Sequence, residues 1–279
     1  MKVSGFTIVR NAIKFNYPVT ESINSILPIC DEFIVNVGDS DDDTLNLIKS
    51  IKSDKIKIIH STWDFSKGKE VLSEQTNIAL KECTGDWAFY LQTDEVIHEA
   101  DLPRLKKIMQ KYLDDKNVDA LRFRWFHFYG SYYRYRIDHG WYQKQDRIIR
   151  NNGEVRSFGD AYGFERKDGT ELKRKNTGAF LYHYGHVNSE NVMLQRRVNA
   201  VKIGFASLKE HEQKGEYFYE DLNSFPIYFG THPAVMKNKI ASHATSQEDK
   251  ATIHQRLWWH PLKIFNVRYK TGKRIKANV

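Results

Sequence analysis

The sequence contains little cysteine and no long apolar run. Cys30 and Cys83 are the only cysteines among 279 residues, which is too few for a disulfide framework. Both lie in apolar or amphipathic stretches, so we expect reduced, buried thiols in a cytosolic protein. No stretch approaches the ~20 apolar residues of a membrane-spanning helix. The first residues, MKVSGFTIVRNAI, are too short and too interrupted for a signal peptide. We therefore expect a cytoplasmic protein.

Acidic residues are outnumbered, with 35 Asp and Glu against 43 Lys and Arg, and the net charge is +8. This balance favours anionic partners such as nucleotides, phospholipid head groups or nucleic acid. Hydrophobic residues make up 41% and aromatic residues 13% of the chain, which supplies a core and excludes general disorder. The length fits one α/β domain with an elaborated second half, or two closely packed subdomains.

The first hundred residues alternate between two periodicities. Short β-branched or apolar runs predict strands, and segments with apolar residues at helical spacing lie between them. The expected strands are residues 3–9, 32–37, 55–60 and 87–91, and the expected helices are 17–29, 43–51 and 73–83. This alternation predicts an α/β fold with a Rossmann-like, mainly parallel sheet flanked by helices. In such sheets, ligands bind beyond the carboxyl ends of the strands.

The composition changes after residue 117. A helix over 101–113 precedes the aromatic, basic stretch 121–135, which predicts two β segments around Gly130. Further strands are expected at 147–151 and 181–184, and a helix at 190–208. We divide the chain into an α/β half at 1–115, an aromatic-rich second half of the same domain at 116–255, and a basic aromatic segment at 256–279.

Two carboxylates follow the fourth expected strand. Asp94 and Glu95 end the segment WAFYLQTDEVI and have no basic neighbour in sequence. Adjacent carboxylates at a strand end suit a hard divalent cation such as Mg²⁺ or Mn²⁺. Phosphate oxygens often complete the coordination shell of such a cation. An acidic turn that caps the next helix would show the same pattern. A second acidic cluster, GDSDDDT at 38–44, contains Asp39 and follows the second expected strand.

The segments IVRNA, VNVGDSDDDT, FSKGKEVLSEQTNIAL and GDWAFYLQTDE occur in an order and at spacings that resemble the amino-terminal half of family 2 glycosyltransferases. RIIR at 147–150 is similar to an Arg-containing stretch of the bacterial members. The resemblance implies a GT-A fold, an inverting transfer and a nucleotide-diphosphate sugar donor bound by the first half, with Mn²⁺ or Mg²⁺. The acceptor would bind the second half.

The resemblance also implies roles for individual residues. Asp94 matches the family's metal-contacting residue, although the first acidic position of that motif is Gln92 here. Asp39 corresponds to the carboxylate that faces the base or ribose. Further residues expected to line the nucleotide pocket are Arg10, Asn11, Lys69 and Asn77. For Lys69, a solvated surface position is an equal alternative.

The segment LYHYGHV adds histidines to the expected site. His183 matches the family's His-Tyr-Gly pattern and is a candidate third metal ligand after Asp94 and Glu95, with His186 as a weaker candidate. A hydrogen-bonded core histidine is the alternative. Arg147 is expected to reach phosphate oxygens, because residues three apart on a strand face opposite sides and only one of Arg147 and Arg150 enters the site.

An inverting transfer needs a base for the acceptor hydroxyl. We place Glu165 first, Asp160 second and Asp138 third, and note that Glu165 could instead pair with Arg166 or a nearby lysine at the surface. Aromatic residues of the second half could stack on the acceptor sugar, or simply pack in a β-hairpin against the sheet. The candidates are Trp125, Tyr133 and Trp141.

The segment from Arg256 to the end is basic and contains Trp258, Trp259 and Phe265. It suits contact with an anionic membrane carrying lipid-linked acceptors, or a helix packed on the domain. Nucleic-acid binding is disfavoured because no nucleic-acid motif is present.

The predicted function is therefore an inverting, metal-dependent glycosyltransferase. It would use a nucleotide-diphosphate sugar, UDP-linked by preference, and a glycan or lipid-linked acceptor. We place it at the cytoplasmic side of the membrane, in the synthesis of bacterial surface polysaccharide or lipopolysaccharide. The alternatives are a nucleotidyltransferase, disfavoured because residues 6–16 lack glycine, and an inactive glycan- or nucleotide-binding module, suggested by Gln92.

Overall fold

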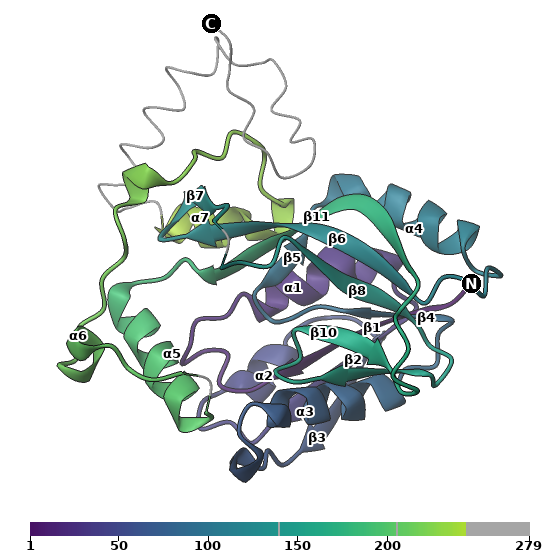
Figure 1. Ribbon diagram of the computed structural model, residues 1–279, viewed down its shortest axis with the longest axis horizontal. Coiled ribbons are helices and arrows are strands. Elements are labelled where there is room, and N and C mark those ends of the chain that lie inside the picture. The colour runs from purple at the N-terminus through teal and green to yellow at the C-terminus, as the bar shows by residue number, and fades with distance from the viewer. Residues whose placement is uncertain (139, 205, 244–279) are drawn as a thin grey trace, which may run out of the picture.

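The computed structural model describes residues 1–138, 140–204 and 206–243, which form a curled central sheet flanked by helices (Figure 1). The strands of the nine-stranded sheet run in the order β3-β2-β1-β4-β8-β6-β11-β5, with β7 paired to β6 outside this path. The first four in sequence are β1 (Val3–Val9), β2 (Glu32–Gly38), β3 (Ile56–Ser61) and β4 (Trp87–Tyr90). They are all parallel to one another.

The apolar runs of β1, β2 and β4 are explained by burial on both faces, whereas the residues of β3 are partly buried or exposed. Every residue of β1 and β4 is buried. On one face, alternate side chains such as Phe33 and Phe89 pack with the helices α1 (Val19–Ile26), α2 (Thr44–Lys49) and α4 (Leu102–Lys111). On the other face, residues such as Ile34 pack with α3 (Glu70–Lys81) and the two-stranded sheet of β9 (Val155–Phe158) and β10 (Gly163–Arg166). The expected α/β sheet with two covered faces is confirmed.

The later strands make the sheet mixed. They are β5 (Glu95–Ile97), β6 (Ala120–Tyr129), β7 (Ser131–Arg136), β8 (Lys144–Arg150) and β11 (Arg174–His186). β8 runs antiparallel to both β4 and β6, whereas β6 and β11 are parallel and β5 is antiparallel to β11. The turn expected at Gly130 joins β6 to β7, and its φ of 65° suits a residue without a side chain.

Helix α5 (Glu190–Lys202) follows β11, and α6 (Glu210–Gln213) and α7 (Lys237–His243) complete the α-helices of the described chain. α5 is shorter than the expected helix over 190–208 because Gly204, with a φ of 74°, follows its last turn. No helix among the described residues has the length and apolar character needed to cross a membrane. The 3₁₀ helices are η1 (Leu27–Ile29), η2 (Phe65–Lys67), η3 (Glu99–Asp101), η4 (Leu222–Ser224) and η5 (Ala234–Met236).

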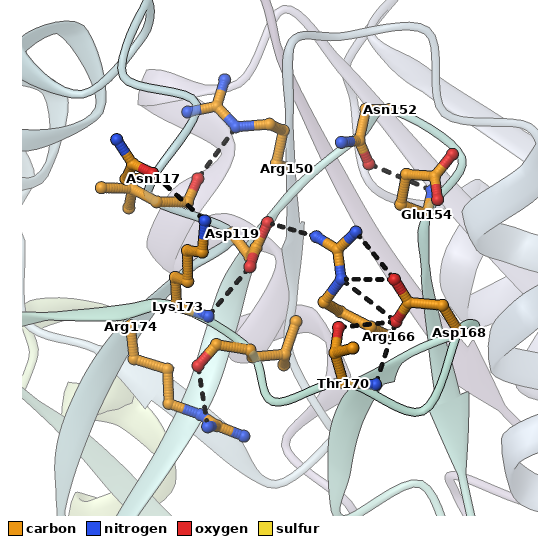
Figure 2. Close-up of polar contacts among 12 residues, drawn as sticks. Asn117, Asp119, Arg150, Asn152, Glu154, Arg166, Asp168, Thr170, Lys173 and Arg174 are labelled. Atoms are coloured by element: carbon orange, nitrogen blue, oxygen red, sulfur yellow. Dashed lines mark hydrogen bonds and ion pairs between the residues drawn. The ribbon is translucent and has the colours of Figure 1, made fainter.

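A polar network joins the elements at the end of the sheet where β4 and β6 begin (Figure 2). The carboxylate of Asp119 accepts from Arg166 Nη1 at 3.0 Å and from the backbone N–H of Lys173 at 2.9 Å. Arg150 donates to the backbone carbonyl oxygens of residues 112, 113, 115 and 118. Arg150 therefore has a structural role here, at the opposite end of β4 from Asp94.

Candidate functional site

A pocket of about 290 Å³ lies at the carboxyl ends of β1 and β4, the position that the parallel sheet predicts. The loops after these strands form one side of it and α5 forms the other. Its lining includes Arg10, Phe15, Tyr17, Trp63, Phe65, Gln92, Thr93, Asp94, Ala161, Arg196, Asn199 and Ile203.

Asp94 lines this pocket, and the ring of His183 lies directly beside Asp94. The antiparallel pairing of β5 with β11 sets His183 opposite Glu95, and the backbone N–H of Tyr184 donates to the carbonyl of Asp94 at 2.8 Å. This register places Asp94 Oδ2 3.5 Å from His183 Nε2. Burial opposes ionisation of the carboxyl, but His183 and Arg196 outweigh burial and lower the pKa of Asp94 to about 2. The pocket wall therefore carries a carboxylate beside an imidazole nitrogen.

Gly185 leaves space beside both of these side chains. A Cβ atom at this position would lie 2.5 Å from Asp94 Oδ2 and 2.7 Å from His183 Nε2. Side-chain atoms do not approach that closely without displacing a neighbour. The space beside these two polar atoms is therefore open only because residue 185 is a glycine, and we call this space the Gly185 cradle.

The donor set suits Mn²⁺ or Mg²⁺ completed by a diphosphate. Bonds of about 2.1 Å to one cation put neighbouring ligand atoms roughly 3 to 3.5 Å apart, which matches the separation of Asp94 and His183. Within the described part of the chain, no group of three or more His, Cys, Asp or Glu side chains is arranged to hold a metal. Gln92 Nε2 instead donates to the carbonyl of Ala161 at 3.3 Å. Phosphate oxygens and water would have to supply the remaining ligands.

Glu95 and Arg147, for which separate roles were expected, bind each other. Arg147 Nε and Nη2 donate to the two carboxylate oxygens of Glu95, both at 2.8 Å, and both side chains are completely buried. Arg147 Nη1 also donates to the carbonyl of Tyr162 at 2.9 Å. Both oxygens of the Glu95 carboxylate are therefore engaged by Arg147, and the guanidinium of Arg147 is engaged by Glu95 and by backbone carbonyl oxygens.

The residues expected after β1 and β2 lie at the mouth of the pocket. Arg10 lines it, donates from Nε to the carbonyl of Asp39 at 2.7 Å, and lies over the ring of Phe65 at 4.9 Å. Asn11 is buried with a φ of 54°, and its side-chain oxygen accepts from the backbone N–H of Asp41. Asn11 therefore holds the two loops together, while the exposed carboxylate of Asp39 stands beside Arg10.

Lys69 and Asn77 are not among the residues that line this pocket. Lys69 is exposed at the start of α3. Asn77 exchanges two hydrogen bonds with the backbone of Ser157, at 2.8 and 2.9 Å, and so ties α3 to β9. It lines a second cavity, of about 710 Å³, between α3 and the β9–β10 sheet.

The three candidate bases have different surroundings. Glu165 lines the second cavity and pairs with Arg156 at 2.9 Å. Asp138 pairs with Arg136 at 2.6 Å. Asp160 lies in the β9–β10 loop directly before Ala161, which lines the Asp94 pocket. Its Oδ1 is buried and has no hydrogen-bond partner among the described residues. Of the three, Asp160 is nearest in the chain to the pocket.

Aromatic side chains surround the histidines. The Trp125 ring lies 5.2 Å from that of His183, and Trp125 Nε1 is buried without a hydrogen-bond partner in the described structure. Trp141 lies 4.6 Å from His186, a ring whose burial lowers its pKa well below the ordinary value. Tyr133, in contrast, packs against a separate aromatic core cluster. Trp125 and Trp141 therefore remain candidates for contact with an acceptor.

Several pocket residues escaped the sequence reasoning. Trp63 and Phe65 follow β3. The rule that ligands bind beyond the carboxyl ends of parallel strands, which pointed to Asp39 and Asp94, would also have pointed to these two residues. Arg196 comes from α5, about half the chain away, and donates to the carbonyls of Phe15 and Gly185. No local sequence signal marks that contact. The same is true of His127, which lies behind His183, and whose burial lowers its pKa to about 3.

Comparison with known proteins gives one family. The model described as Glycosyl transferase family 2 matches residues 8–168, more than half of the chain. No curated protein matches.

Solved structures are similar at low identity. Residues 1–349 of S. aureus TarS in complex with UDP are 21% identical, with 77% of this chain and 69% of that chain covered and a TM-score of 0.42. Glucosyl-3-phosphoglycerate synthase from Mycobacterium tuberculosis, with Mn²⁺, UDP and glucosyl-3-phosphoglycerate, is 15% identical over 74% and 81% of the two chains, with a TM-score of 0.40. The match spans only 42% of a longer TarS chain. The resemblance read from the sequence is confirmed by the family match, and so is the expected GT-A type of fold. The chain belongs to glycosyl transferase family 2.

Proposed function

We propose that this chain transfers a sugar from a UDP-sugar to a glycan or lipid-linked acceptor, with inversion, in the synthesis of a bacterial surface polysaccharide or lipopolysaccharide. The observation that carries the proposal is the Asp94–His183 pair, which stands over the Gly185 cradle at the wall of a pocket at the strand ends. Family membership supports the class of reaction. The donor sugar would meet the acceptor on the Asp160 and Trp125 side of this pair.

The pocket offers the contacts that a nucleoside needs. Trp63 and Phe65 both line the pocket, with ring centroids 6.2 Å apart, and they offer aromatic faces on which a nucleobase would stack. Arg10 closes the mouth beside Asp39. With the base there, the diphosphate extends toward Asp94 and His183.

Asp94 and His183 would hold Mn²⁺ or Mg²⁺ together with the diphosphate oxygens. When bound, the cation neutralises the charge that develops on the departing diphosphate. Asp160 acts as the base. The acceptor oxygen bonds to the anomeric carbon as the carbon–oxygen bond to the diphosphate breaks and its electron pair leaves with the nucleotide. The hydroxyl proton passes to Asp160. Attack from the face opposite the leaving group inverts the anomeric centre.

The base assignment has a direct test. Asp160→Asn is expected to lower kcat by about 10²-fold or more, because an amide cannot take the proton. Its affinity for UDP, measured by calorimetry, should stay close to that of the wild type. Glu165→Gln is the matched control, since it makes the same change in a residue of the neighbouring strand that pairs with Arg156. If Glu165→Gln instead lost activity while Asp160→Asn remained fully active, Glu165 and not Asp160 would be the base.

The function itself is tested by a thermal-shift screen of nucleoside diphosphates and their sugars, with and without Mn²⁺. A ligand that binds only the folded state raises the melting temperature. We expect the largest shift from a UDP-sugar with Mn²⁺, followed by slow hydrolysis of that donor. Release of pyrophosphate from a nucleoside triphosphate and a sugar phosphate would identify a nucleotidyltransferase instead. Donor binding without any hydrolysis or transfer would identify an inactive module.

The location of the enzyme follows from the proposed substrates. We propose that it acts in the cytoplasm, at the inner face of the membrane, where a lipid-linked acceptor would be presented. The basic segment 256–279, which we expected to contact anionic lipid, lies outside the described residues.

A further inference from the structure

His127 lies directly behind His183. The parallel pairing of β6 with β11 sets these two residues opposite each other. Their Nδ1 atoms are 3.1 Å apart, and His127 Nε2 lies 2.7 Å from the backbone carbonyl oxygen of Tyr142. Both histidines are buried. The two contacts form a chain from Tyr142 through His127 to His183.

The direction of each hydrogen bond in this chain follows from the chemistry of its ends. A carbonyl oxygen only accepts, so His127 Nε2 carries a hydrogen. His127 is almost completely buried, so a second hydrogen on its ring would place a positive charge where water does not reach it. Neutral His127 therefore presents a bare Nδ1, and the hydrogen between the two Nδ1 atoms belongs to His183.

We propose that His127 is a positioning residue, which fixes the ring of His183 with Nδ1–H held and Nε2 turned toward Asp94 as the cation-binding atom. This inference rests on the cation site of the proposed function. Imidazole ligands of metals commonly donate their second N–H to an outer partner that fixes their orientation. Here that partner is a second histidine, itself held by a backbone carbonyl.

The packing of the site strengthens this arrangement. The ring of Trp125 lies against both histidines, at 4.4 Å from His127 and 5.2 Å from His183. These contacts oppose rotation of either ring. The chain of hydrogen bonds therefore decides which nitrogen of His183 faces the pocket.

The first test uses the metal-free wild-type protein. In a ¹⁵N-histidine NMR spectrum at neutral pH, Nδ1 of His183 is expected to be protonated, with the resonance assigned by its loss in His183→Gln. An unprotonated Nδ1 would overturn the proposal. This measurement depends on neither catalysis nor a donor sugar, and needs no variant of His127 to fold.

The second test compares His127→Asn with His127→Gln. An asparagine amide reaches the position of Nδ1 and can still accept from His183, whereas a glutamine amide reaches the position of Nε2 and keeps only the contact with Tyr142. Mn²⁺ affinity, measured from the EPR signal of the free ion, should fall about 10–100-fold in His127→Gln and remain within about 3-fold in His127→Asn. His60→Asn, an exposed histidine on β3, is the control and should bind as the wild type does.

The outcomes separate this inference from the proposed function. Equal Mn²⁺ affinity in the folded Asn and Gln variants, or no Mn²⁺ binding by the wild type, would overturn the role of His127. If the expected order of affinities is found but no nucleotide sugar is bound or cleaved, the positioning role stands and the proposed function fails.

Discussion

Asp94→Asn is expected to lower kcat/KM for sugar transfer on the order of 10²–10³-fold, the loss typical of removing one group that stabilises developing charge. The amide keeps the shape of the side chain but removes the charge that would hold the cation beside His183. UDP should still enter the pocket, yet its affinity should no longer increase when Mn²⁺ is added. Calorimetric titration of UDP with and without Mn²⁺ measures this difference, and circular dichroism confirms the fold.

The matched control for this experiment is Asp168→Asn. Asp168 is an exposed carboxylate that pairs with Arg166 in the network at the other end of the sheet (Figure 2). It makes the same chemical change far from the pocket and should leave the Mn²⁺ dependence intact. Wild-type affinity for UDP and Mn²⁺ in Asp94→Asn would refute the assignment of this residue.

Arg147→Met should be the most destabilising single change among those considered. It removes the guanidinium and leaves the carboxylate of Glu95 buried without its partner. Breaking a buried ion pair in this way costs about 3–5 kcal/mol of the free energy of unfolding. Urea-induced unfolding, followed by tryptophan fluorescence, measures the change in midpoint at constant slope.

A double variant distinguishes a buried ion pair from a ligand-binding arginine. Glu95→Leu combined with Arg147→Met replaces both charges by apolar groups, and it should recover most of the lost stability. If Arg147 instead contacted phosphate, the single variant would unfold like the wild type and lose affinity for UDP. An unchanged unfolding midpoint in Arg147→Met would contradict the structural role.

The first half of the fold was predictable because its signals are local. β1, β2 and β4 are buried on both faces, so each reads as a nearly continuous apolar run, whereas the residues of β3 are partly buried or exposed. Helices with an apolar stripe separate these strands. The strand-end rule then gave the position of Asp94. For the second half, the predicted strands near 121–135 and 147–151 exist, but their mixed order depends on pairings between residues far apart in sequence, such as β6 with β11.

The candidate site was predicted less completely, for the same physical reason. Asp94 and His183 were both named, because Asp94 follows a strand and His183 lies in a recognisable histidine-containing strand segment. The pairing of Glu95 with Arg147 could not be seen, because it joins β5 to β8 through residues that are 52 positions apart in sequence. Similarly, nothing local distinguishes Glu165, which faces Arg156, from Asp160, which stands beside the pocket.

Gly185 has a consequence for how such a chain could change its function over evolution. The space that it leaves is bounded by Asp94 and His183, so one added methyl group would compete with a cation for the same volume. Asp94 and His183, which we propose as the cation ligands, would still be encoded, and the pocket lining at Trp63 and Phe65 would be unchanged. A lineage could thus turn an enzyme into a nucleotide-binding scaffold by a single codon change. Among homologous chains, the presence of glycine at this position is therefore as informative about retained chemistry as the acidic residue itself.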